Sequence, residues 1–218
     1  MTKELVISSY KEDTSWIDNI NKDVKIYLYN KDNKPNTINL PNIGREAHTY
    51  LYHICNNYDN LSDYIFFFQG NPFDHTGMCI NIINGNEKDW NNNVQMHFDG
   101  YWGYAHNSLG TMWKLDTSIQ FEGECLSCRN DGYPHCNEFP GGILPIKEIW
   151  NQIFEVPIPD MLEFIPGCQF HIHKNLIYNK SLILWEKLYN MSENMQYFPW
   201  MFERIVPYIL NNNFKIKQ

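Results

Sequence analysis

The stretch Leu61–Thr76, LSDYIFFFQGNPFDHT, decides how the rest of the chain is interpreted. Tyr64–Phe68 is a short apolar run rich in aromatic residues, which is typical of a strand buried on both faces. Gly70 and Pro72 follow it closely, and these residue types interrupt regular structure. The stretch therefore predicts a buried strand that ends near Gln69 and continues into a tight loop.

Asp74 and His75 lie side by side just beyond the end of this strand. In open α/β sheets, ligands bind outside the carboxyl ends of the strands. A carboxylate beside an imidazole at that position suits metal binding or acid/base chemistry. The alternative is structural, with Asp74 capping a helix and His75 filling a turn.

The segments around Tyr64–Phe68 predict an α/β domain. Strands are expected at 5–9 and 25–29, and helices at about 16–20 and 44–57. This β-α-β-α-β order predicts a parallel sheet with crossover helices. We therefore predict a single domain over residues 1–218, Rossmann-like, with a mixed and mostly parallel central sheet flanked by helices.

The second half of the chain has weaker periodicity. We predict a strand at 118–122, a helix at 144–154, a strand at 168–173 entered through Pro166 and Gly167, and helices at 181–191 and 199–210.

Composition excludes several classes of function. The formal net charge is −8 over 218 residues, which argues against non-specific nucleic-acid binding because that requires a basic surface. No run approaches the roughly 18 apolar residues that span a bilayer, and no signal-peptide pattern opens the chain. A cytoplasmic protein is expected. The bias toward Asn, Ile, Lys and Tyr is typical of an AT-rich genome. If the protein is viral, its expected location is the host cytoplasm or the virion.

The loop after the first strand is a candidate nucleotide site, although it has neither a dinucleotide fingerprint nor a Walker A pattern. Its polar residues are Ser8, Ser9, Tyr10, Glu12 and Asp13. Tyr10 could stack on a base, and Glu12 or Asp13 could accept a hydrogen bond from a base or ribose. The alternative is that Asp13 or Thr14 caps the following helix with Ser15.

Gln169, His171 and His173 alternate along a predicted strand and therefore share one face. Two histidines in this spacing can coordinate one metal ion. If this strand lies near Tyr64–Phe68, Asp74, His75 and His171 could bind one divalent ion. The alternative is a polar strand face without a metal.

The cysteines suggest a second, separate site. Cys125, Cys128 and Cys136, with His135, have most of the spacing of a structural zinc site. A disulfide or free thiols remain alternatives. Cys55 and Cys168 are interpreted as small core residues.

Three motifs together resemble an uncharacterised family known only as a domain of unknown function. They are GREAHTYLYHI at 44–54, QGNPFDH at 69–75 and PGCQF at 166–170. That family is similar in layout to GT-A glycosyltransferases, which bind a sugar nucleotide over the first half of a Rossmann-like sheet. The resemblance implies a nucleotide-binding half at about 1–76 and an acceptor half at about 77–210.

GT-A enzymes usually bind the donor diphosphate through a divalent ion on a D-x-D motif at a strand end. This chain has Gln69-Gly-Asn71 at that place, and amide oxygens are weaker ligands for hard cations than carboxylates. The resemblance then implies that Asp74 and His75 bind the Mn²⁺ or Mg²⁺ ion, or that the ion is lost. A late Glu-Arg pair, here Glu203 and Arg204, recurs in several branches of these enzymes.

The predicted function is transfer of a sugar from a nucleotide-sugar to a hydroxyl of a glycan or protein acceptor. The predicted catalytic residues are Asp74 and Glu203, with Asp99 as another candidate base. The predicted ligands of the ion are Asp74, His75 and His171. The predicted contacts of the nucleotide-sugar are Ser9, Tyr10, Glu12, Asp13, Arg45, Gln69 and Asn71.

Two other functions stay open at this point. The first is a non-catalytic carbohydrate-binding protein on a degenerate form of the fold, with Trp90, Tyr101 and Trp102 stacking on sugars. The second is a metal-dependent hydrolase that uses Asp74, His75 and His171.

Overall fold

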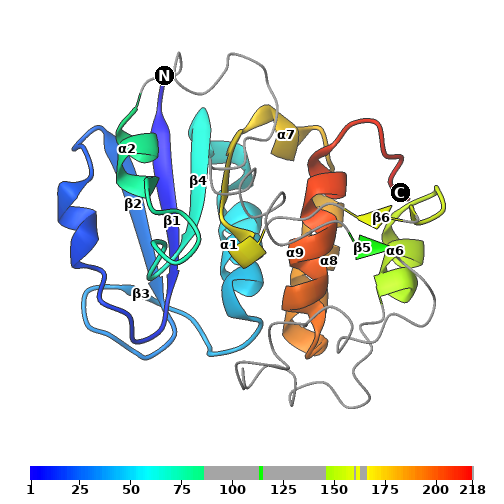
Figure 1. The fold of residues 1–218 in the computed structure, drawn as a ribbon, viewed down its shortest axis with the longest axis horizontal. Helices are drawn as coiled ribbons and strands as arrows, with labels where there is room; N and C mark the ends of the chain where they lie inside the picture. Colours follow the sequence, from blue (N-terminus) through cyan, green and yellow to red (C-terminus); the bar gives the residue numbers. More distant parts are fainter. Residues whose placement is uncertain (86–112, 115–145, 160, 163–165, 218) are drawn as a thin grey trace.

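A computed structural model describes residues 1–85, 113–114, 146–159, 161–162 and 166–217. Its centre is a five-stranded sheet with the strand order β3-β2-β1-β4-β7 (Figure 1). The strands are β1 (Lys3–Ser9), β2 (Val24–Asn30), β3 (Ile38–Asn39), β4 (Tyr64–Gln69) and β7 (Phe170–His173). The first four are parallel and β7 is antiparallel to β4, so the predicted mixed, mostly parallel α/β sheet is confirmed.

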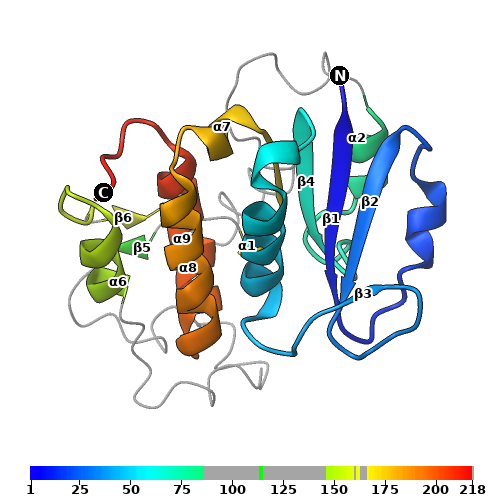
Figure 2. The same ribbon diagram turned by 180° about the vertical axis from the view of Figure 1, so that it is seen from behind.

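The described helices lie on both faces of this sheet. Figures 1 and 2 show α2 (Cys79–Asn84) in front of one face and α1 (Arg45–Asn57) in front of the other. The remaining described helices are α6 (Ile146–Ile153), α7 (Asn175–Tyr178), α8 (Leu182–Asn194) and α9 (Phe198–Leu210). Three 3-10 turns are η1 (Ser15–Asn19), η2 (Tyr58–Asn60) and η5 (Pro166–Cys168).

The buried strand at Tyr64–Phe68 is confirmed, because all five side chains are buried. Successive residues of a strand point to opposite faces. Ile65 and Phe67 join the core formed with α1, α8 and α9, whereas Phe66 and Phe68 pack in a second core with η1 and α2. Two separate cores explain why the run is apolar without interruption.

Two elements differ from the prediction. The first crossover is the 3-10 turn η1, not an α-helix, because Trp16 alone of its five residues is buried and supplies one anchor to the core. The short strand β3 was not predicted, since its two residues are exposed at the edge of the sheet and have no apolar alternation.

A second, small sheet pairs β5 (Trp113–Lys114) with β6 (Met161–Leu162). Several predictions lie outside the described residues. These are the strand at 118–122, Trp90, Asp99, Tyr101, Trp102 and the possible zinc ligands Cys125, Cys128, His135 and Cys136. None of the described helices has the length and apolar character that a membrane span requires.

Candidate functional site

The carboxyl ends of β1 and β4 form the topological switch point of the sheet. The two strands are neighbours, and the chain goes from β1 toward β2 on one side but from β4 toward β7 on the other. Open α/β sheets bind their ligands at such a point. We call the residues around it, from Ser8 to Glu12 and from Gln69 to His75, the strand-end site.

The two loops of the strand-end site touch at Gly70. A Cβ atom at Gly70 would lie 2.7 Å from Glu12 Oε2 and 2.9 Å from Ser9 Cβ, so only glycine fits without displacement. The Gly70 N–H donates to Ser8 O at 2.8 Å, and the Trp16 indole N–H donates to Gly70 O at 2.8 Å. The Glu12 carboxylate lies against Gly70, directly after the end of β4.

Among the residues after β1, some side chains are exposed to a ligand and others are bonded within the fold. Tyr10 is 38% exposed, and its N–H donates to Glu12 Oε2 at 2.6 Å. Ser9 is buried, and its hydroxyl bonds Tyr29 O and the Asn30 amide. Asp13 accepts two hydrogen bonds from Ser15, which lower the pKa of Asp13. The N-cap residue of η1 is Thr14, whose side chain makes no capping hydrogen bond.

The residues after β4 are tied to the turn that precedes β7. Gln69 Nε2 donates to Gly167 O at 2.8 Å, and the His75 ring lies against Gly167. Asn71 Nδ2 donates to Asp74 Oδ2 at 3.3 Å, and Asp74 is exposed on the surface of the loop. Burial lowers the pKa of His75, which favours the neutral form of its ring.

The structure does not bring the three predicted metal ligands together. His171 lies within β7 opposite Phe66, and its ring packs on the Phe66 ring at 5.2 Å between centroids. His75 packs instead at the turn before β7. Within the described ranges, no group of three or more His, Cys, Asp or Glu side chains is placed to bind one metal ion. The divalent ion stays a prediction.

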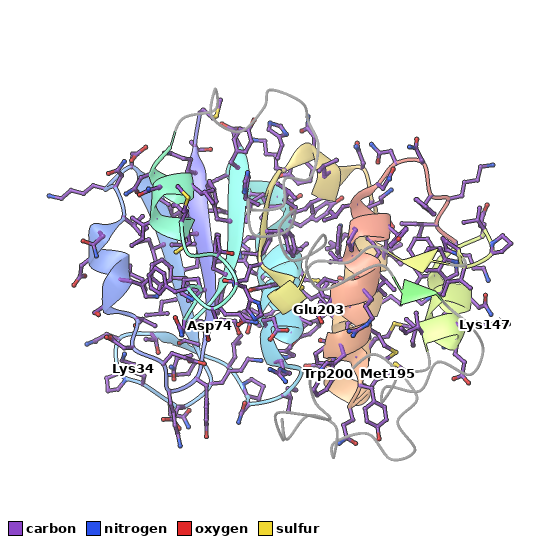
Figure 3. The ribbon with its side chains drawn as sticks, viewed as in Figure 1. Lys34, Asp74, Lys147, Met195, Trp200 and Glu203 are labelled. Carbon is purple, nitrogen blue, oxygen red and sulfur yellow. The ribbon has the colours of Figure 1, made fainter. Side chains whose placement is uncertain are left out.

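Glu203 reaches the same turn from α9. Its Oε1 accepts the Gly167 N–H at 2.6 Å, and its Oε2 lies 3.3 Å from Arg204 Nη1. Burial raises the pKa of Glu203 to about 7, and the nearby charge of Glu46 adds to the rise. Asp74 and Glu203 both lie toward the end of the molecule where the parallel strands finish (Figure 3).

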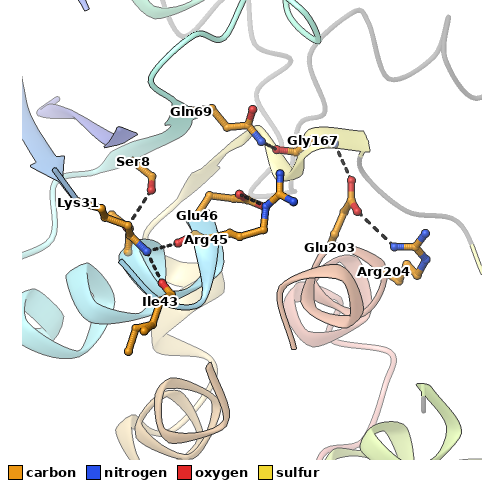
Figure 4. A network of polar contacts seen from close by, with 10 residues as sticks. Ser8, Lys31, Ile43, Arg45, Glu46, Gln69, Gly167, Glu203 and Arg204 are labelled. Carbon is orange, nitrogen blue, oxygen red and sulfur yellow. Dashed lines mark hydrogen bonds and ion pairs between the residues drawn. The ribbon is translucent and has the colours of Figure 1, made fainter. Parts of the chain in front are cut away.

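Figure 4 shows the contacts of Glu203 with Gly167 and Arg204 and, beside them, a second group of polar contacts at the start of α1. Glu46 at the start of α1 lies 3.7 Å from Arg45 Nε, and burial raises the pKa of Glu46 as well. Titratable groups with perturbed pKa values cluster at functional sites, so Glu46 and Glu203 mark this region as a candidate. The hydroxyls of Ser8 and Thr49, 2.9 Å apart, join β1 to α1.

A family model described as "Protein of unknown function (DUF3431)" matches residues 5–217. The chain belongs to this family. No curated protein and no solved structure matches the chain. Membership of the DUF3431 family extends over both strand ends and the late helix that carries Glu203, so the whole candidate site lies within the matched region.

Sequence reasoning missed two residues that the structure places in this region of the DUF3431 chain. Lys31 is buried directly after β2, and Glu46 begins α1 beside Arg45. A lysine immediately after a strand end was a usable signal, because that position faces the ligand edge of the sheet. Nothing in the spacing of Glu46 separates it from an ordinary first-turn acid of a helix.

Replacing Gly167 with alanine is expected to destabilise the protein by about 2 kcal/mol or more. Gly167 has φ +74°, and an added Cβ would lie 2.4 Å from His75 Cδ2. Urea denaturation measures the change. The matched control is Gly77→Ala, where no atom lies within 4 Å of the added Cβ, and a change within about 0.5 kcal/mol is expected. Equal losses in both variants would contradict the packing of His75 on Gly167.

Proposed function

We propose that this protein is a glycosyltransferase that moves a sugar from a nucleotide-sugar donor to an acceptor hydroxyl. One observation carries the proposal. The loops after β1 and β4 meet at Gly70, at the switch point where α/β sheets bind ligands, and they present Tyr10, Glu12 and Asp74 there. The mixed, mostly parallel sheet is also compatible with the Rossmann-like layout that the resemblance to GT-A enzymes implies.

Three exposed side chains in and near the strand-end site, those of Tyr10, Glu12 and Arg45, have roles in contacting the donor in this proposal. The Tyr10 ring is exposed and stacks on the base, and the Glu12 carboxylate accepts a hydrogen bond from the ribose. The Arg45 side chain is exposed and binds the negatively charged diphosphate. Ser9 and Asp13 then act by holding the loop, because their side chains bond within the fold.

Glu203 is the proposed base. The acceptor hydroxyl oxygen attacks the anomeric carbon, the bond from that carbon to the diphosphate oxygen breaks, and the hydroxyl proton passes to Glu203. A pKa of about 7 suits this role, because general bases work best when their pKa is near the operating pH. The protonated Glu203 returns its proton to water after the product leaves.

In this proposal a divalent ion binds together with the donor. Mg²⁺ commonly binds one or two carboxylates together with substrate phosphates, so a full protein ligand set is not required. Asp74, on the loop after β4, would supply a carboxylate to the ion. Mn²⁺ or Mg²⁺ would offset the charge of the leaving diphosphate.

Melting temperatures test the donor. We expect one of UDP-, GDP- or CMP-sugars, with Mn²⁺, to raise the melting temperature by roughly 5–10 °C at a ligand concentration about 100 times Kd. Asp74→Asn should remove the effect of Mn²⁺, because it removes a charged ligand. Asp59→Asn is the control, since Asp59 is exposed on η2 before β4.

Three outcomes separate the functions. Stabilisation by a nucleotide-sugar with release of the nucleoside diphosphate supports the transferase. Stabilisation by free glycans and by no nucleotide-sugar would replace it with the carbohydrate-binding protein. Turnover of a phosphoester or glycoside without any nucleotide would replace it with the hydrolase. An unchanged response to Mn²⁺ in Asp74→Asn would remove Asp74 from the ion site.

A further inference from the structure

Lys31 has an unusual environment for a lysine. It follows β2 directly and is 7% exposed, and its N–H donates to Ser9 O at 2.9 Å. Its ammonium group donates to two main-chain carbonyls, those of Ile43 and Arg45 (Figure 4). Burial lowers the pKa of Lys31 to about 8, so the ammonium is mainly protonated at pH 7. A charged donor thus ties the end of β2 to the start of α1.

The residue that Lys31 holds has a strained backbone. Arg45 has φ +46°, and the preceding Gly44 has φ +58°. A non-glycine residue in the left-handed region costs free energy and persists only where its surroundings enforce it. The hydrogen bond from Lys31 to Arg45 O is one such constraint.

This backbone conformation sets the direction of the Arg45 side chain. The guanidinium carbon lies 5.1 Å from the centre of the Trp200 ring, a cation–π distance. Trp200 is one turn before Glu203 on α9, so Arg45 reaches the neighbourhood of the proposed base. Its side chain is 43% exposed and therefore accessible to a ligand.

We propose that Lys31 is a positioning residue that fixes Arg45 to bind the diphosphate group of a ligand. The inference deepens the proposed function and rests on it for the identity of the donor. The arginine guanidinium donates two N–H groups to phosphate oxygens, and stacking on an aromatic ring orients the guanidinium before the phosphate binds. Lys31 itself is buried behind Arg45 and acts through it.

The charges near Arg45 suit a diphosphate. Lys31, Arg45 and Arg204 contribute three cationic groups, whereas Glu46 and Glu203 are the described carboxylates whose charges act on this network. Burial raises the pKa of both carboxylates, and it raises the pKa of Glu203 to about 7, so the negative charge of Glu203 is reduced near neutral pH. In a chain of net charge −8, a phosphate-bearing ligand needs such a local excess of cations.

The first experiment observes Arg45 without any ligand. The Arg45 Nε–Hε NMR signal should be shifted by the Trp200 ring, and its loss in Arg45→Lys assigns it. Lys31→Met should move this signal toward its value in an unstructured peptide. Lys3→Met is the matched control, because Lys3 Nζ also donates to two carbonyls, those of Ile83 and Gly85, at a distant place. An unmoved signal in Lys31→Met would overturn the positioning role.

The second experiment measures Kd for inorganic pyrophosphate by calorimetry. Arg45→Ala should weaken binding about 10- to 100-fold, and Lys31→Met about tenfold. In the Arg45→Ala background, Lys31→Met should weaken binding no further, because the two residues act as one unit. Lys31→Gln, which keeps neutral N–H donors, replaces Lys31→Met if that variant does not fold.

The outcomes separate this inference from the proposed function. Pyrophosphate binding that depends on Arg45, with no stabilisation by any nucleotide-sugar, would keep the inference and reject the transferase. If the protein binds a nucleotide-sugar but Arg45→Ala leaves the affinity for pyrophosphate unaltered, the transferase is kept and the inference is rejected. The absence of pyrophosphate binding to the unmodified protein would overturn the inference.

Discussion

Replacing His53 with leucine is expected to lower the free energy of unfolding by about 3–5 kcal/mol. His53 Nε2 lies 3.0 Å from Glu4 Oε1, and both side chains are fully buried. The Tyr29 hydroxyl lies 2.9 Å from His53 Nδ1, and the Ser62 N–H donates to Glu4 Oε2 at 3.3 Å. Loss of the imidazole leaves a carboxylate buried without its main partner, which costs far more than the lost contact.

Urea denaturation at pH 7 measures this loss. The double variant Glu4→Leu with His53→Leu should recover part of the stability, since it removes both polar groups together. The comparison is Asp63→Asn, which breaks the part-exposed pair of Asp63 with Lys174 and should cost at most about 1 kcal/mol. A loss in His53→Leu no larger than that in Asp63→Asn would contradict the importance of the buried pair.

We expect the Glu203→Gln variant to become more stable than the unmodified protein as the pH rises, measured as the free energy of unfolding. The pKa of Glu203 is about 7 in the folded protein against 4.5 for the free group. Between these values the folded state binds more protons than the unfolded state, so stability falls with rising pH. The stability that the raised pKa of Glu203 contributes is fully present below pH 4.5 and is lost as the pH rises through 7. The loss is about 3 kcal/mol, because each pKa unit corresponds to about 1.4 kcal/mol.

Stability measured at pH 4.5 and pH 8 in both proteins checks this prediction. The difference between Glu203→Gln and the unmodified chain should grow by about 3 kcal/mol across that range. The matched control is Glu186→Gln on α8, an exposed glutamate that should give no such change. A constant difference for Glu203→Gln would show that Glu203 has an ordinary pKa, and Glu203 would then be a poor base at neutral pH.

Stability that is lost when Glu203 ionises is consistent with a functional site. Proteins retain destabilising polar groups where activity requires them, so stabilising substitutions at such positions commonly reduce activity. We therefore expect Glu203→Gln to abolish turnover of the donor while raising stability at pH 8. This combination distinguishes a proposed base from a structural ion pair with Arg204.

Much of the fold could be predicted because the signals are local. Tyr64–Phe68 is apolar at every position, and a strand with two buried faces requires this. The helix predicted at 44–57 is confirmed as α1, since its apolar residues keep helical spacing and pack on the sheet and α8. The turn η1 and the short strand β3 were harder to predict, because few of their residues are buried.

The sequence alone determined the buried strand, the loop at Gly70 and the position of Asp74 and Glu203 as candidate residues. Only the tertiary structure decided which groups meet. Among the described residues it does not place Asp74, His75 and His171 to bind one metal ion, and it brings Gly167 and Glu203 together across 36 residues of chain. The physical reason is that spacing along a chain specifies which face of an element a side chain occupies, whereas contacts between elements depend on how the cores pack.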